Sequence, residues 1–177
     1  MSKSNSNDTP SKAEDIGLVG QTPLHIHKQY LKDMSFENPN APGIFNKIEQ
    51  RPVMDMNISL DVQKLEHEEH EFYYEVSLKL NASATQGNTA MFIADVVYAA
   101  AVSLHGVEEK HHHPLLFIEV PQLIFPFARQ ILANATHAGA FMPLQLSPVD
   151  FKAMYLKRFA QNDADKNEST KSSEDTA

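Results

Sequence analysis

A chain of 177 residues, 42% of them hydrophobic, is long enough to bury the core of one domain. The absence of cysteine excludes disulfides, thiolate metal sites and a cysteine nucleophile, and it favours a cytoplasmic location. The net charge of −8 argues against nucleic acid as a partner, because phosphate backbones are bound through clustered Lys and Arg. No uninterrupted apolar run has the length of a membrane span or follows the first lysines, so we expect neither direct membrane insertion nor a cleaved signal.

Composition divides the chain into three parts. Residues 1–22 are dominated by Ser, Asn, Lys and Asp, and residues 161–177 contain no large apolar side chain. Such segments cannot bury enough apolar surface to fold, so we expect a disordered N-terminal tail and a disordered acidic C-terminal tail. Residues 23–160 are predicted to form a single domain.

Alternating apolar and polar side chains predict that the first part of this domain is a sheet. The alternation covers residues 24–32, 54–63 and 72–85, which predicts three strands that each bury one face. Residues 89–104 are apolar on both faces apart from Asp95, which predicts a strand covered on both sides. Short connections imply an antiparallel sheet with a hairpin between the second and third strands.

The segment SFENPNAPGIFN, residues 35–46, is predicted to be a loop because it contains two prolines and a glycine. It nevertheless carries Phe36, Ile44 and Phe45, which an exposed loop ordinarily lacks. The next strand begins with two methionines, Met54 to Met56, and methionine and aromatic side chains suit a surface that binds varied partners. Ordinary core packing is the alternative explanation.

Helical periodicity begins only after the strands. Apolar side chains recur at helical spacing over residues 124–135, and Gly139 stands where this helix would end. Prolines within residues 114–126 predict an irregular start. A second helix is predicted to begin with Ser147 as its N-cap and Asp150 at the capping-box position. Strands followed by helices indicate an α+β fold.

Two histidine clusters are the candidates for metal binding. The sequence HEEH, His67 to His70, lies in a predicted turn without the spacing of a zinc-binding helix, and His111, His112 and His113 precede a proline. We expect solvated side chains and no metal at either place. Motifs of serine hydrolases and nucleotide-binding loops are absent, so no catalytic residue and no cofactor is predicted. A histidine-metal enzyme is the alternative, which metal analysis would distinguish.

Three segments resemble the SecB family of protein-export chaperones in order and spacing: YLKDMSFENPNAP (Tyr30 to Pro42), IFPFAR (Ile124 to Arg129) and LSPVDFKAMY (Leu146 to Tyr155). The resemblance covers residues 23–160. It implies a four-stranded antiparallel sheet with two C-terminal helices, assembled as a homotetramer that is a dimer of dimers. It also implies an ATP-independent holdase, not an enzyme, which keeps secretory preproteins unfolded in the cytoplasm and delivers them to the SecA motor.

The resemblance further implies a groove that binds unfolded client segments. The matching positions come from the loop after the first strand, the next strand and the last helix: Ile44, Phe45, Met54, Met56, Ile58, Tyr155 and Phe159. A wide apolar groove would select unfolded chains, because a folded protein has already buried the side chains that such a groove accepts.

A docking surface for the motor is implied as well, at Asp33, Glu37, Ile93 and Asp95. A carboxylate within an apolar strand is costly unless it faces water or a cation, and the motor's basic, zinc-bearing tail would supply that cation. Any zinc would then belong to the partner. A SecB-like chaperone of a toxin–antitoxin system is the alternative within this fold, and the genomic neighbourhood would distinguish the two.

Overall fold

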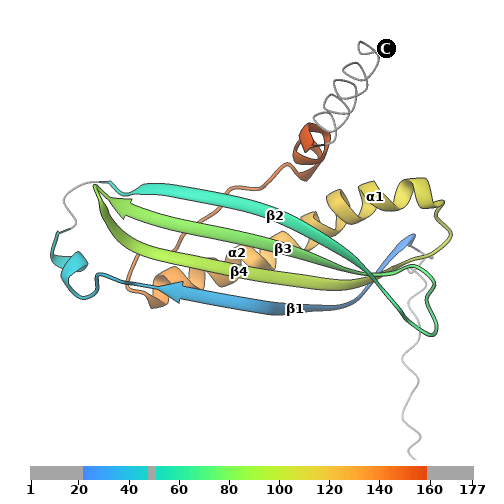
Figure 1. Cartoon of the computed structure of the whole chain (residues 1–177), viewed down its shortest axis with the longest axis horizontal. Helices are drawn as coiled ribbons and strands as arrows, with labels where there is room; N and C mark the ends of the chain where they lie inside the picture. The colour runs from blue at the N-terminus through green and yellow to red at the C-terminus, as the bar shows by residue number, and fades with distance from the viewer. Residues whose placement is uncertain (1–21, 48–50, 159–177) are drawn as a thin grey trace, which may run out of the picture.

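The computed structural model describes residues 22–47 and 51–158. The described chain forms one four-stranded sheet with a long helix lying across one of its faces (Figure 1). A second, shorter helix follows at residues 151–158, after an extended segment that runs back along the molecule. The α+β class is therefore confirmed.

Every neighbouring pair of strands in the sheet is antiparallel. The strands are β1 (Leu24–Glu37), β2 (Val53–Leu65), β3 (Tyr73–Gln86) and β4 (Thr89–Leu104). Their order across the sheet is β1-β4-β3-β2, so β1 and β2 form opposite edges. The four predicted strands and the β2–β3 hairpin are confirmed, and the segment after β1 must connect one edge to the other.

β1 is longer than the alternation of its side chains predicts, because it continues to Glu37. Phe36 therefore pairs with Ala94 of β4 and stacks on Phe92, where the prediction placed it in a loop. The hydrogen-bonded ladder ends just before Pro39, which has no backbone N–H to donate. The loop is consequently shorter than expected.

A continuous helical stretch follows the sheet, and its start is irregular, as the prolines predict. It consists of η2 (Glu109–His111), α1 (His112–Pro114), the wider π-helical segment η3 (Leu115–Glu119) and α2 (Val120–Ala138). In η3 the N–H of Val120 donates to the carbonyl of Leu115, five residues back. Pro121 has no N–H, and its ring would clash with the carbonyl four residues back in a regular helix, so the widened turn accommodates it.

One stripe of α2 packs against the sheet and forms the core. Val120, Ile124, Ala128 and Leu132 follow one another at successive helical turns and have no solvent exposure. They share the core with alternate side chains of β3 and β4: Val76, Leu78, Leu80, Ala82, Ala94, Val96, Ala100 and Val102. Burial of these apolar surfaces against each other is the main stabilising contribution of the fold.

The opposite face of the sheet, called the outer face below, has no helix against it in the described chain (Figure 1). The prediction that β4 is covered on both sides is therefore wrong for the single chain, since Ile93 on the outer face is 40% exposed. Ala99 is buried there because larger side chains flank it, including that of Tyr30 directly opposite on β1. Small side chains explain the apolar character of β4 without a second layer.

Among the described residues, the stretch Glu109–Ala138 has the length and composition of a membrane-spanning helix, with 30 residues and a window of mean hydropathy 1.4. A helix in a protein core satisfies the same criterion, and the buried stripe of α2 lies against the sheet. Its other side carries Leu123 and Phe127, which are 49% and 51% exposed. This helix therefore has more apolar surface than the sheet covers.

The short helix at residues 151–158 begins later than predicted. Asp150 and not Ser147 is its N-cap, because the Asp150 carboxylate accepts a hydrogen bond from the N–H of Ala153 at 2.8 Å. An ionised carboxylate at this position also interacts favourably with the helix dipole. Phe151, 3% exposed, anchors the helix by packing edge-on against a phenylalanine of α2.

Gly139 ends α2 against Phe36, and a Cβ at this position would overlap the phenyl ring. We expect Gly139→Ala to lower the free energy of unfolding by about 1–3 kcal/mol, because the ring is stacked on Phe92 and would have to shift. Urea unfolding measures the change. Gly43→Ala is the matched control, since nothing lies within 4 Å of a Cβ there. Equal unfolding free energies for the two variants would contradict this packing argument.

Candidate functional site

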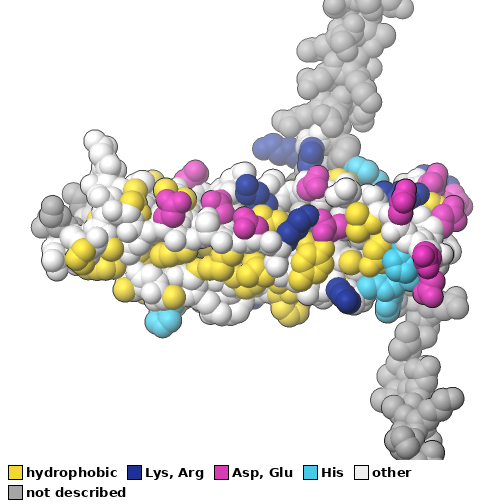
Figure 2. Space-filling view, turned by 60° about the horizontal axis from the view of Figure 1, so that its bottom comes forward, with side chains coloured by type: hydrophobic (Ala, Val, Ile, Leu, Met, Phe, Trp, Pro, Cys, Tyr) yellow, Lys and Arg dark blue, Asp and Glu magenta, His cyan; other side chains and the backbone are white. Residues whose placement is uncertain are grey.

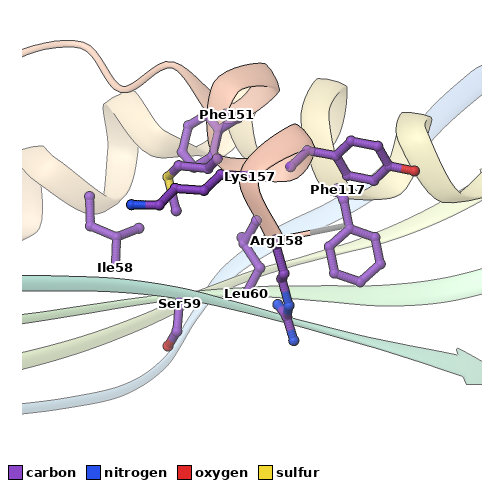
Figure 3. A pocket seen from close by; sticks show the side chains of 9 residues that line it. Ile58, Ser59, Leu60, Phe117, Phe151, Lys157 and Arg158 are labelled. Atoms are coloured by element: carbon purple, nitrogen blue, oxygen red, sulfur yellow. The ribbon is translucent and has the colours of Figure 1, made fainter. Parts of the chain in front are cut away.

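Two open cavities lie along the β2 edge of the sheet. The methionine cavity, of about 440 Å³, is lined by Pro52, Met54, Met91, Phe92, Ala140, Phe141, Met142, Pro143, Leu144 and Gln145. The tyrosine cavity, of about 280 Å³, is lined by Ile58, Ser59, Leu60, Phe117, Phe151, Met154, Tyr155, Lys157 and Arg158 (Figure 3). Both include side chains from the apolar face of β2, so the strand connects them.

The wall of the methionine cavity is the segment that follows α2, and Thr136 holds it in place. The buried Thr136 hydroxyl accepts a hydrogen bond from the N–H of Leu144 at 2.9 Å and donates to carbonyls within α2. The N–H of Phe141 donates to the Thr136 carbonyl at 3.1 Å. The Phe141 ring then packs between Phe92 and Phe45, with centroids 5.2 and 5.5 Å away. The wall is thus fixed by both hydrogen bonds and ring packing.

The tyrosine cavity is bounded by a link between the long helix and the short one. The His113 ring stacks on Phe117, with 4.4 Å between centroids, and His113 Nδ1 lies 3.0 Å from the Tyr155 hydroxyl. Burial and the neighbouring Arg158 guanidinium lower the pKa of His113. The neutral ring can therefore accept a hydrogen bond from the Tyr155 hydroxyl. Arg158 and Lys157 add positive charge to an apolar cavity (Figure 3).

The structure places five of the seven residues predicted for the groove at or beside the cavities. Met54, 41% exposed, lines the methionine cavity, whereas Ile58 and Tyr155 line the tyrosine cavity. Met56 is half-buried on the same face of β2, between the two. Phe45 packs behind the wall of the methionine cavity. Phe159 lies outside the described residues.

Ile44 requires a correction, because it is 3% exposed in η1 (Gly43–Lys47) and lines neither cavity. The N–H of Ile44 donates to the carbonyl of Asn40 at 2.9 Å, and the Asn40 amide donates to the carbonyl of Ala90 at 2.9 Å. These bonds hold the loop down on the sheet, so Ile44 joins the core. Its apolar character serves folding.

Sequence analysis missed the wall itself. The segment GAFMPLQL, residues 139–146, contains several apolar side chains in a connection between two helices, and Met142 is 89% exposed. The apolar composition of this connection was the signal that could have identified it. The segment has neither strand nor helix periodicity, so periodicity did not predict a role for it.

The outer face gathers the four residues predicted for a docking surface. Antiparallel pairing places them in three adjacent rows across β1 and β4: Asp33 with Val97, Ser35 with Asp95, and Glu37 with Ile93. Asp55 of β2, which the sequence analysis did not select, continues the row of Ile93. The exposed isoleucine therefore lies among carboxylates, and Figure 2 shows acidic side chains along one side of a hydrophobic band.

Two carboxylates on this face already have partners. The half-buried Asp95 accepts hydrogen bonds from the Asn81 amide and, at 3.4 Å, from the Ser35 hydroxyl, which offsets the cost of placing it in an apolar strand. Further along, the Tyr30 hydroxyl and the Lys32 ammonium both bind Glu75. Their hydrogen bonds lower the pKa of Glu75, and the carboxylate raises the pKa of Tyr30 to about 12.

The sequence analysis predicted that all three side chains of the triple histidine are solvated, and this prediction is wrong for His112. His112 is 4% exposed, because its Nε2 donates to the carbonyl of Val107 at 2.9 Å and its Nδ1 lies 3.3 Å from the Tyr74 hydroxyl. This ring therefore fixes the start of the long helix to β3. Within residues 22–47 and 51–158, no three His, Asp or Glu side chains are grouped so as to hold a metal ion.

An antiparallel sheet with open apolar cavities at one edge, and with carboxylates around an exposed isoleucine on its outer face, has the features of a protein that binds other proteins. The family described as preprotein translocase subunit SecB matches residues 19–162. The protein-export protein SecB of Acidiphilium cryptum is 41% identical, covering 81% of this chain and 93% of its own length. That of Rhodopseudomonas palustris is 39% identical, covering 89% and 96%. The chain belongs to the SecB family of protein-export chaperones, which is not a family of enzymes.

A solved structure has the same fold. A SecB-like chaperone of Mycobacterium tuberculosis, in complex with a peptide from an antitoxin, superposes with a TM-score of 0.59. The two sequences are 18% identical, and the match covers 72% of this chain and 91% of the other. At this low sequence identity the likeness shows a common fold only. The relatives that are 41% and 39% identical are protein-export proteins.

Proposed function

We propose that this protein is an ATP-independent holdase, which binds unfolded secretory preproteins in the cytoplasm and delivers them to the SecA motor. Membership of the SecB family supports the role in export. The observation that carries the client-binding part is the pair of apolar cavities along the β2 edge, where methionine and aromatic side chains remain accessible.

The cavities suit unfolded chains for a physical reason. An apolar client side chain gains about 25 cal/mol for each Å² that it removes from water. Met54 and Met142 are 41% and 89% exposed, so they have surface to offer, and the flexible thioether adapts to differently shaped side chains. A folded protein has too few exposed apolar groups to offset the entropy lost on binding.

We place the motor-docking surface on the outer face around Ile93. Three carboxylates of neighbouring rows, those of Asp33, Glu37 and Asp95, lie around this exposed apolar side chain. A basic segment with an apolar residue among its cations would match both features. The SecA tail is the partner that family membership supports.

We further propose that four copies assemble as a dimer of dimers. Leu31 and Met34 on the β1 edge, and Leu123 and Phe127 on α2, are between 39% and 51% exposed. Figure 2 shows hydrophobic side chains forming a band along much of the molecule. Exposed apolar surface beside an edge strand favours association with further copies.

Client binding is tested by following the refolding of a reduced, unfolded preprotein in the absence of ATP. An excess of the wild-type chaperone is expected to delay this refolding. We expect Met54→Ser/Met142→Ser to weaken client binding about tenfold, because two accessible apolar contacts are lost. Val53→Ser is the matched control, since Val53 is 69% exposed on the same strand but lines neither cavity. No delay by the wild-type protein for any unfolded client would refute the holdase proposal.

Motor docking is tested by measuring SecA affinity and client affinity for the same variants. Asp33→Lys and Asp95→Lys are expected to weaken SecA binding by tenfold or more at low salt, because each reverses a charge at a site for a basic partner. Client binding should not change. Glu119→Lys, an exposed carboxylate next to α2, is the control and should retain SecA binding. An equal loss of SecA binding and client binding would contradict the assignment of the docking surface to these carboxylates.

Assembly is tested by light scattering, where we expect a mass near four times 19.8 kDa. Phe127→Lys should lower that mass, because it places a charge in the apolar band. Leu156→Lys is the control, since Leu156 is similarly exposed, at 56%, but lies on the short helix. A monomeric wild-type protein would exclude the tetramer.

A further inference from the structure

Five histidines gather at one end of the outer face, away from both cavities and from the acidic rows. His25 and His27 belong to β1, His67 and His70 to the β2–β3 connection, and His105 directly follows β4. The rings form a chain of neighbours from His25 to His27, His70 and then His67 or His105, with centroids 4.5 to 5.3 Å apart. Figure 2 shows histidines concentrated at one end, beside carboxylates. We refer to these five residues as the histidine cluster.

In two of the rings, the hydrogen-bonding surroundings of Nδ1 suit a nitrogen that carries no proton. Nδ1 of His67 accepts a hydrogen bond from the N–H of Glu69 at 3.2 Å, and a proton on this nitrogen would abolish that bond. Nδ1 of His70 is buried, and no hydrogen-bond partner for it lies within the described ranges of the chain. A proton there would create a buried donor without an acceptor, which is unfavourable.

Ser103 connects two further rings. Its hydroxyl is fully buried and lies 2.8 Å from Nε2 of His27 and 2.9 Å from Nε2 of His105. The hydroxyl has one proton, so it can donate to one imidazole while it accepts from the other, and two neutral rings complete this arrangement. A β-bulge between Ile26 and Lys28 interrupts the regular alternation at His27, which allows the ring to approach Ser103.

The other members of the cluster oppose the protonation of His27. Burial lowers the pKa of His27, and charge on His25, His70, His67 or His105 lowers it further. The other ionisable groups nearby are Tyr73 and Glu75 on β3, Lys28 on β1, and Glu66, Glu68, Glu69 and Glu71 in the β2–β3 connection. Those four carboxylates are exposed, so water screens them, and Glu75 is bound by Tyr30 and Lys32.

We propose that the histidine cluster is a proton-sensitive clasp, which joins the first residues of β1 to the β2–β3 connection when its rings are neutral and releases them when several are protonated. Positive charges at ring-contact distance repel, the bond to Nδ1 of His67 is lost, and the Ser103 hydroxyl can no longer donate to either ring. The stabilisation is complete above the ordinary histidine pKa of about 6.5. It falls as the pH drops below that value, because the released form binds more protons.

The release is expected to remain local. The first residues of β1 lie in an edge strand, and beyond the strand pairing they are held by the bond from the N–H of His105 to the carbonyl of Pro23, at 3.0 Å. The β2–β3 connection is held by the bond from the N–H of Leu104 to the carbonyl of Phe72, also at 3.0 Å. None of the five rings belongs to the core that α2 forms with the sheet, so this core should persist.

The test compares amide hydrogen exchange at pH 7.5 and pH 5.5 in the wild-type protein and in His27→Gln/His67→Gln/His70→Gln, with EDTA present to exclude adventitious metal. After correction for intrinsic exchange, protection of residues 24–30 and 66–75 should fall about tenfold or more in the wild type. In the triple variant it should change by less than about threefold, because only His25 and His105 of the cluster remain and neither has another cluster ring beside it. Protection within α2 should stay constant in both.

His137→Gln is the control, because His137 is exposed on α2 outside the cluster, and this variant should respond to pH as the wild type does. Unchanged protection of the wild type at pH 5.5, an equal loss in the triple variant, or an equal loss throughout α2 would each overturn the proposal. Imidazole NMR titration of the wild type gives a check that needs no variant. A His27 midpoint clearly below 6.5 supports the clasp, and a midpoint at or above 6.5 overturns it.

Discussion

The packing of one stripe of α2 against one face of the sheet is the interaction on which the rest of the structure depends. Val120, Ile124, Ala128 and Leu132 complete the core of the described chain with the inner side chains of β3 and β4. The outer face is therefore left for polar and charged side chains. Apolar side chains that this core does not enclose remain at the β2 edge, at the β1 edge and on the far side of α2, where they are available to other proteins.

The two ends of the helical stretch shape the cavities. At its start, the π-helical turn that accommodates Pro121 carries Phe117, which lines the tyrosine cavity and stacks on His113. At its end, Thr136 fixes the segment whose side chains line the methionine cavity. Both cavities thus depend on local departures from regular helix, which are held by specific hydrogen bonds. The proposed client-binding surface is therefore supported by backbone that hydrogen bonds and ring packing hold in place.

The outer face is divided along its length by charge. Carboxylates around Ile93 occupy one end, the ion pair of Lys32 and Glu75 lies in the middle, and the histidine cluster occupies the other end. Carboxyl groups in general are charged near neutral pH, whereas imidazoles in general gain charge as the pH falls through about 6.5. Docking and the opening of the clasp would therefore use different parts of one surface.

Sequence alone determined the four strands and the α+β class through local periodicity, and the family through contiguous motifs. The resemblance to that family, and not periodicity, implied that Asp33, Glu37, Ile93 and Asp95 share a face. Tertiary structure decided what depends on residues distant in the chain. A hydrogen bond from Asn40 to Ala90 of β4 holds the loop that buries Ile44, Thr136 positioned a wall that has no periodicity, and strand pairing brought together histidines from three segments. No local pattern encodes such contacts, since each forms only when the sheet order is set.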